Sequence, residues 1–186
     1  MKKWLGAVCM GWLLLHGLGS GVALPAEGEV WAWGKNDTGQ MGMGGKSEVS
    51  QIRPMPVKGV MHTVAILGIS ECSVAVKSDG TVWDWGYNGE GTVGDGSRTD
   101  RWSPVRVAML ADVVAIGGGV YHVMALKSDG TVWDWGSNGS GRLGNGTATS
   151  QLTPVQALGI TGVTAIAGAH SHSLAIVNDV TKENTD

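Results

Sequence analysis

Short apolar segments separated by glycine-rich or polar turns recur along most of the chain. Between residues 79 and 128 they read TVWDWG, PVRVAM, VVAIGG and HVMALK. Each has the length of a β-strand and is rich in β-branched or large apolar residues. The pattern predicts four strands in this part of the chain, and segments of the same kinds occur before and after it.

The segments belong to three tandem repeats. Residues 127–141, KSDGTVWDWGSNGSG, match residues 77–91, KSDGTVWDWGYNGEG, at thirteen of fifteen positions, and residues 27–39 hold a weaker copy, EGEVWAWGKNDTG. Such a period is the signature of a repeat architecture. We interpret residues 27–178 as one domain and residues 179–186 as a polar tail. Aligned on Trp-x-Trp-Gly, the repeats span residues 27–78, 79–128 and 129–178.

The joints between segments predict antiparallel pairing. Asp79-Gly80 and Asp129-Gly130 separate two strand-like segments, and Asp-Gly suits the positive φ of a tight hairpin turn. Four antiparallel strands in about 50 residues make one propeller blade. Trp133 and Trp135 alternate along their strand, so both rings face the same neighbouring blade. The expected fold is therefore all-β, a partial β-propeller of three four-stranded antiparallel blades.

The array resembles the regulator of chromosome condensation repeat family. The matching words are DGTVWDWGxNGxGxLGxG, then Pro154-Val155, then the segment at 165–175 that ends in His172-Ser173-Leu174-Ala175. The resemblance covers residues 27–178 and implies β-propeller blades. Its precedents are a nuclear guanine-nucleotide exchange factor and secreted bacterial propellers that inhibit β-lactamases. Where the later repeats carry His122 and His172, the first carries Cys72.

The repeat number departs from the family pattern. The family's ring has seven blades, whereas three repeats are present here, and after Asn178 no further Gly-Thr-Val-Trp occurs. Three blades leave strand edges open. Three interpretations remain: a fragment of a longer array with a structural role only, copies that assemble as a homo-oligomer to complete the open blades, or an open arc.

The N-terminal segment has the layout of a secretory signal peptide. Lys2 and Lys3 precede an apolar run from Trp4 to Leu18, and small residues follow. We expect cleavage after Ala23, or as late as Ala26, and hence a secreted or periplasmic protein; the short basic leader suggests a bacterial source. The alternative, a retained membrane anchor, is disfavoured because the run is shorter than the ~20 residues of a spanning helix.

The charge of the chain argues against nucleic acid as a partner. Without Lys2 and Lys3, 11 of the 13 basic residues remain against 16 acidic residues. An acidic surface does not favour phosphate backbones. Removing the leader would also leave a single cysteine, Cys72, so no internal disulfide is expected.

Residues for catalysis or cofactor binding are scarce. Four histidines follow the leader, and His170-x-His172 is the one pair that could bind a metal from one face of a strand. Because His172 shares its repeat position with His122, we favour a structural role, and we expect no metal and no cofactor. The Asn- and Gly-rich loops lack the EF-hand and phosphate-loop spacings and suit turns instead.

Differences between the repeats indicate candidate binding residues, since positions that vary are not needed for the fold. The second repeat presents aromatic and arginine side chains, which often dominate interface energy, where the third has small, polar or aliphatic ones. These candidates are Tyr87, Arg98, Arg101, Trp102 and Tyr121. For Trp102 the alternative is a buried plug, because Leu152 aligns with it; for the others it is an ordinary solvated loop.

These features predict an exported, non-enzymatic binding module that recognises a protein partner through propeller loops, with no membrane contact once the leader is removed. An exchange factor fits poorly because the leader directs the chain out of the cytoplasm. A hydrolase fits poorly because no nucleophile with a matching base is evident.

Overall fold

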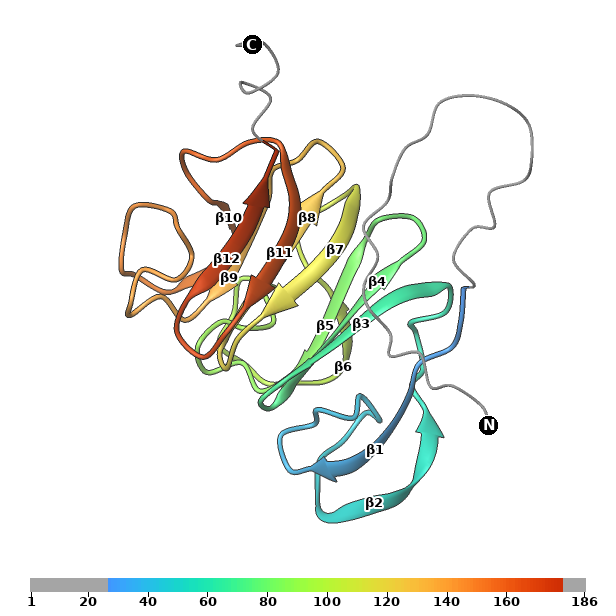
Figure 1. The fold of residues 1–186 in the computed structure, drawn as a ribbon. Helices are drawn as coiled ribbons and strands as arrows, with labels where there is room; N and C mark the ends of the chain where they lie inside the picture. The colour runs from blue at the N-terminus through green and yellow to red at the C-terminus, as the bar shows by residue number, and fades with distance from the viewer. Residues whose placement is uncertain (1–26, 179–186) are drawn as a thin grey trace, which may run out of the picture.

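The computed structural model describes residues 27–178, so the predicted signal peptide and polar tail lie outside the described residues. This part of the chain contains twelve β-strands and no helix, and the strands form sheets stacked one behind another (Figure 1). The predicted all-β fold is confirmed. A search of these residues for a helix long and apolar enough to cross a membrane finds none.

Two complete four-stranded antiparallel sheets form the middle of the stack. The first contains β3 (Thr63–Ile69), β4 (Cys72–Lys77), β5 (Val82–Gly86) and β6 (Arg101–Arg106). The second contains β7 (Val113–Gly118), β8 (His122–Lys127), β9 (Val132–Gly136) and β10 (Gln151–Gln156). In both, the strand order follows the chain, as in a propeller blade.

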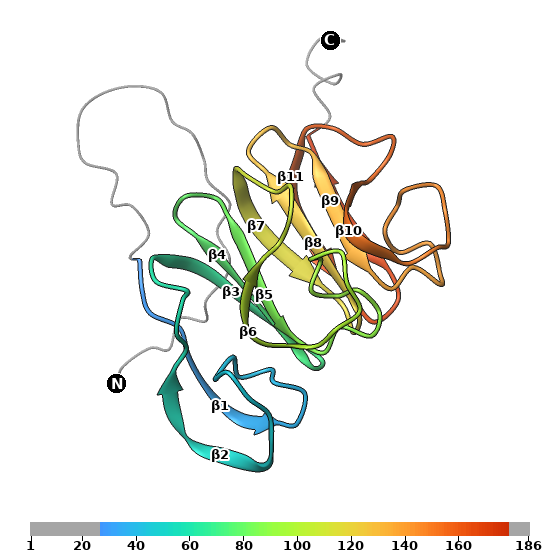
Figure 2. The same cartoon turned by 180° about the vertical axis from the view of Figure 1, so that it is seen from behind.

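A two-stranded sheet lies at each end of the stack (Figures 1 and 2). β1 (Trp31–Asn36) pairs with β2 (Ser47–Pro56), and β11 (Val163–Gly168) pairs with β12 (Ser173–Val177). The sheets are thus half a repeat out of step with the sequence repeats. Three repeats of four strands give two complete blades and two half-blades rather than three complete blades.

The tight Asp-Gly turns explain this offset. Gly80 N donates to Lys77 O at 2.9 Å, and Asp79 Oδ1 accepts from Thr81 N at 3.0 Å. The turn therefore joins β4 directly to β5, although the repeat boundary falls between them. The turn at Asp129-Gly130 does the same for β8 and β9. Each complete sheet combines the end of one repeat with the start of the next.

The hydrophobic core lies between consecutive sheets. Trp135 of β9 is fully buried in a cluster with Val74 and Val76 of the preceding sheet. Trp85 of β5 is buried in a cluster with Val30, Val57 and Val60, which flank the strands of the first half-blade. Burying an aromatic side chain contributes a few kcal/mol at about 25 cal/mol per Å². The other tryptophan of each strand, Trp83 or Trp133, is partly buried on the same side, as the alternation predicts.

Candidate functional site

One end of each sheet carries a strand-to-loop exit held in a fixed geometry. Tyr87 follows β5, and its backbone N donates to Glu71 O at 3.0 Å; Ser137 follows β9 and donates to Tyr121 O at 2.7 Å. The residue before each exit is a glycine with positive φ, +118° at Gly86, packed so closely against the neighbouring turn that a Cβ would overlap it. The side chain of Tyr87 is therefore presented from a rigid strand end.

A buried asparagine organises the loop beyond each exit. Asn88 Nδ2 donates to the carbonyl oxygens of Ser97 and Thr99, each at 3.1 Å, while Asn88 Oδ1 accepts from Val93 N at 3.0 Å. Asn138 repeats this arrangement in the next sheet. These amides are used in closing the loops, which supports the interpretation of the Asn- and Gly-rich segments as turns.

Two of the predicted binding residues meet on this face. The rings of Tyr87 and Tyr121, from adjacent sheets, have their centroids 6.1 Å apart and are tilted by 59°. This distance is within the range of favourable aromatic pairs. Partial burial, followed by the charge of Glu90, raises the pKa of Tyr87, so its phenol stays neutral at physiological pH.

Arg98 joins this pair through the loop backbone. Its guanidinium donates to Gly89 O, and the Tyr87 hydroxyl lies over Gly89. Arg98 is itself exposed. We call Tyr87, Arg98 and Tyr121 the tyrosine patch.

The structure places Arg101 inside its own loop. Its Nε donates to Asp95 Oδ2 at 2.5 Å, and its guanidinium also reaches Ser97 Oγ at 3.4 Å. Burial alone raises the pKa of Asp95, but hydrogen bonds from Ser97 and Arg101 outweigh it and hold that pKa below its ordinary value. Arg101 therefore stabilises the loop that carries Arg98.

Trp102 lies against the first repeat. Gly44 N donates to Trp102 O at 2.8 Å, the indole packs on Gly39, and Lys46 Nζ stands 5.8 Å from the ring centroid. With 43% of its surface exposed, Trp102 acts partly as the plug that its alignment with Leu152 suggested. Leu152 packs on Gly91 in the same way one sheet further on.

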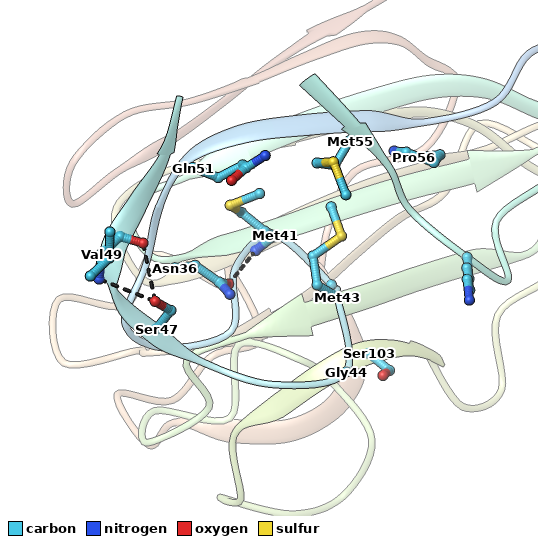
Figure 3. A pocket seen from close by; sticks show the side chains of 12 residues that line it. Asn36, Met41, Met43, Gly44, Ser47, Val49, Gln51, Met55, Pro56 and Ser103 are labelled. Atoms are coloured by element: carbon cyan, nitrogen blue, oxygen red, sulfur yellow. Dashed lines mark hydrogen bonds between the residues drawn. The ribbon is translucent and has the colours of Figure 1, made fainter. Parts of the chain in front are cut away.

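The sequence interpretation missed a methionine-lined pocket of about 540 Å³ beside β2. Figure 3 shows the side chains of Met41, Met43 and Met55 around it, with Met41 held in place by Asn36 Oδ1, which accepts from Met41 N at 3.1 Å. The one local signal for this pocket in the sequence is the run Met41-Gly42-Met43-Gly44. Met55, which lies on β2, gave no local signal.

At the repeat position that the histidines and the cysteine share, His122 and Cys72 are buried, whereas His172, just before β12, is exposed. His122 Nε2 lies 3.1 Å from Ser173 Oγ, and burial lowers the pKa of His122 to about 4. Cys72 donates its thiol to Tyr87 O at 2.8 Å, and burial raises its pKa far above the ordinary range. Neither group is poised for attack on a substrate.

Acidic side chains do not assemble into a metal site in the part of the chain that the structure describes. Between residues 27 and 178, no group of three or more His, Cys, Asp or Glu side chains could hold a metal ion. Asp84 and Asp134 are buried between the sheets, one on each complete sheet, and burial raises both pKa values, that of Asp134 to about 8.

Comparison with family models and a curated relative identifies the repeats. One model described as the regulator of chromosome condensation (RCC1) repeat matches residues 27–74, 79–126 and 129–176. A second model of the same description matches residues 113–142. The mitochondrial RCC1 domain-containing protein RUG3 of Arabidopsis thaliana is 34% identical over 70 residues, which cover 37% of this chain and 15% of the plant protein.

Solved structures share the fold. A crystal structure of Prp20p from Saccharomyces cerevisiae, which binds Gsp1p and histones, superimposes with a TM-score of 0.69 and 16% identity, covering 79% of this chain and 39% of the yeast chain. Yeast RCC1 (Prp20) bound to Kap60 gives 0.68 and 22% identity, covering 81% and 38%. The chain thus spans about two fifths of the yeast propeller.

Proposed function

Because the chain belongs to the regulator of chromosome condensation repeat family, we propose that it is a non-enzymatic module that binds a protein partner through the tyrosine patch. The observation that carries this proposal is the contact between Tyr87 and Tyr121 across two sheets. Tyrosine and arginine are the side chains that most often dominate interface energy. Rigid strand ends hold the two rings, so little side-chain entropy is lost on binding.

The binding partners of the yeast relative support a protein ligand. Prp20p binds Gsp1p, histones and Kap60, all of them proteins. The full chain has 16 acidic against 13 basic residues, which disfavours a nucleic-acid ligand. A hydrolase activity has less support, because His122 is buried and neutral and the tyrosine patch holds no general base. An exchange-factor role has less support, because the leader-like residues 1–23 favour export from the cytoplasm.

Export is part of the same proposal. Residues 1–23 have the basic start, apolar run and small-residue end of a signal peptide. A periplasmic or secreted module would meet an extracytoplasmic protein. Fractionation of cells that produce the full chain, with N-terminal sequencing of the product, tests this separately from binding. A full-length product retained in the cytoplasm would exclude export.

Site-specific crosslinking tests the binding face. A photoreactive phenylalanine analogue at Tyr121 should yield a protein adduct in extracts of the source cells, and an excess of unmodified chain should abolish it. The same analogue at Met109 serves as the control, because Met109 is exposed and precedes β7, whereas Tyr121 follows β7 at its other end.

The captured partner then allows a quantitative test. Tyr87→Ala with Tyr121→Ala should weaken its binding at least ~10-fold, which corresponds to about 1.4 kcal/mol. Leu158→Ala, at an exposed position in the β10–β11 turn, should leave binding unchanged. Unchanged binding by the double variant, with native circular dichroism, would rule out the tyrosine patch as the binding surface.

A further inference from the structure

Consecutive sheets are joined by one repeated set of contacts. Trp85 Nε1 donates to Gln40 O at 2.9 Å, and Trp135 Nε1 donates to Thr92 O at 2.7 Å. In each case the acceptor lies in the loop between the last two strands of the preceding sheet. Trp102 on Gly39 and Leu152 on Gly91 complete the same two joints.

The N-terminal half-blade has the tryptophan of this joint, but within the described residues no preceding loop accepts a hydrogen bond from it. Trp33 occupies the repeat position of Trp85 and Trp135, yet 63% of its surface is exposed, against 1% and 0% for those two. Ile52 on β2 aligns with Trp102 and Leu152 and is 88% exposed. The described chain offers no loop for these two side chains to enter.

The C-terminal half-blade has the opposite deficit: the acceptor loop of the joint is present, but within the described residues no tryptophan strand pairs with β12. Ile176 on β12 is 63% exposed, whereas the aligned Val76 and Leu126 are 1% and 4% exposed because each packs in a hydrophobic cluster with the following sheet. In the loop before this half-blade, Arg142 aligns with Gln40 and Thr92. Gly144 lies against Ala157, without the tryptophan that covers Gly42 and Gly94.

We propose that β1 of one copy pairs antiparallel with β12 of a second copy and completes a four-stranded blade between them. The internal sheets supply the register: Ser73 pairs with Trp85 and Ala75 with Trp83, so Ser173 is expected opposite Trp33 and Ala175 opposite Trp31. Trp33 Nε1 then donates to Arg142 O of the other copy, and Ile52 packs on Gly141.

A second copy is the occupant that the edges specify. Within residues 27–178, β1 is the one Trp-x-Trp-Gly strand without a neighbour of the β4 type, and β12 is the one β4-type strand without a Trp-x-Trp-Gly neighbour. The two edges lie at opposite ends of the stack, so they meet between copies (Figures 1 and 2).

The number of copies follows from the geometry of propellers. A heterologous joint generates a ring when its rotation closes. Propeller rings have about four to eight blades. Each copy contributes two complete sheets and two half-sheets. Two copies therefore make a ring of six blades, one fewer than the seven of the family's ring, and three copies would exceed the usual range.

Complementation between two variants tests this pairing. Trp33→Glu blocks the β1 edge and Ile176→Glu blocks the β12 edge, and both positions are exposed in the single chain, so both variants should fold. The native mass by light scattering, divided by the chain mass under denaturing conditions, should be 2 for the parent and 1 for each variant alone. An equimolar mixture of the two variants should return to 2, because one intact β1 and one intact β12 remain.

Met109→Glu is the matched control, since it adds the same charge at an exposed apolar position away from both edges and should keep the ratio at 2. A parent ratio of 1 at all concentrations, association of either edge variant alone, or failure of the mixture to associate would each overturn the proposal. The tyrosine patch is unaffected by these substitutions, so its partner binding can be measured independently.

Discussion

His122 Nε2 lies 3.1 Å from Ser173 Oγ, and this contact links the second complete blade to the C-terminal half-blade. Ser173 Oγ in turn donates to Arg142 O at 2.7 Å, so the serine connects β8, β12 and the β9–β10 loop. The imidazole is fully buried. A neutral ring suits this position, because a charged one would lack solvation.

We predict that His122 stays neutral across the physiological pH range. Burial, and secondarily the charge of Arg142, lowers its pKa to about 4, whereas an unfolded histidine titrates near pH 6.5. Because the unfolded chain binds the proton first, this residue lowers stability as pH falls from about 6.5 to about 4. Proton NMR of the ring should give a midpoint near 4 in the native protein. A native midpoint above 6 would contradict the buried arrangement.

The strands were largely predictable from sequence because local chemistry defines them. The alternating Trp-x-Trp strand and the Asp79-Gly80 turn need only near neighbours in the chain. The grouping of strands into sheets was harder to predict. Alignment of the repeats puts a boundary at Asp79. The turn at that point is closed by a backbone hydrogen bond between Lys77 and Thr81, so the strands before and after it belong to one sheet.

The tyrosine patch illustrates what sequence alone could not supply. Tyr87 and Tyr121 come from different sheets, so their contact depends on how the blades stack. The role of Arg101 did leave a signal: the repeat with Arg101 also has Asp95, and the next repeat has neutral Gln151 and Asn145 in those places. Comparing these pairs would have indicated the ion pair.

We predict that Gly136 and Gly139 respond in opposite ways to alanine. Gly136 has φ +98° and a Cβ there would overlap Tyr121 O, so Gly136→Ala should destabilise the fold by at least about 2 kcal/mol. Gly139 has open space around it and no positive φ, so Gly139→Ala should be neutral or stabilising by up to about 1 kcal/mol. Urea unfolding of both variants provides the comparison; equal losses would show that the strand exit is not rigid.

We predict that Trp135 stabilises the fold through both its indole N–H and the packing of its ring. Trp135→Phe leaves Thr92 O without its 2.7 Å donor and removes part of a fully buried ring system, and the two losses together should cost at least about 2 kcal/mol. Trp102→Phe, on a half-exposed indole, should cost less than about 1 kcal/mol. Denaturant midpoints at constant slope measure both. A similar small loss for the two variants would argue against the tryptophan as the link between sheets.

We predict that the stability difference between Asp134→Ala and the parent shifts in favour of the variant as the pH rises from acid to neutral. Burial raises the pKa of Asp134 to about 8, whereas an unfolded aspartate titrates near pH 4. Between these values the native carboxyl stays protonated and the unfolded one ionises, so stability falls by about 1.4 kcal/mol per pH unit as pH rises, and the loss is complete above pH 8. The first repeat has Ala32 at this position, which shows that the strand accepts alanine.

Urea unfolding at pH 5 and pH 7 measures this effect as the difference between Asp134→Ala and the parent. The variant should gain about 2–3 kcal/mol relative to the parent between the two pH values. Val132→Ala on the same strand removes buried apolar volume without a titrating group, so its cost should be equal at both pH values. If Asp134→Ala behaves like Val132→Ala, the carboxyl of Asp134 is ionised in the native protein, and the buried aspartate must have a cationic or hydrogen-bonding partner in solution.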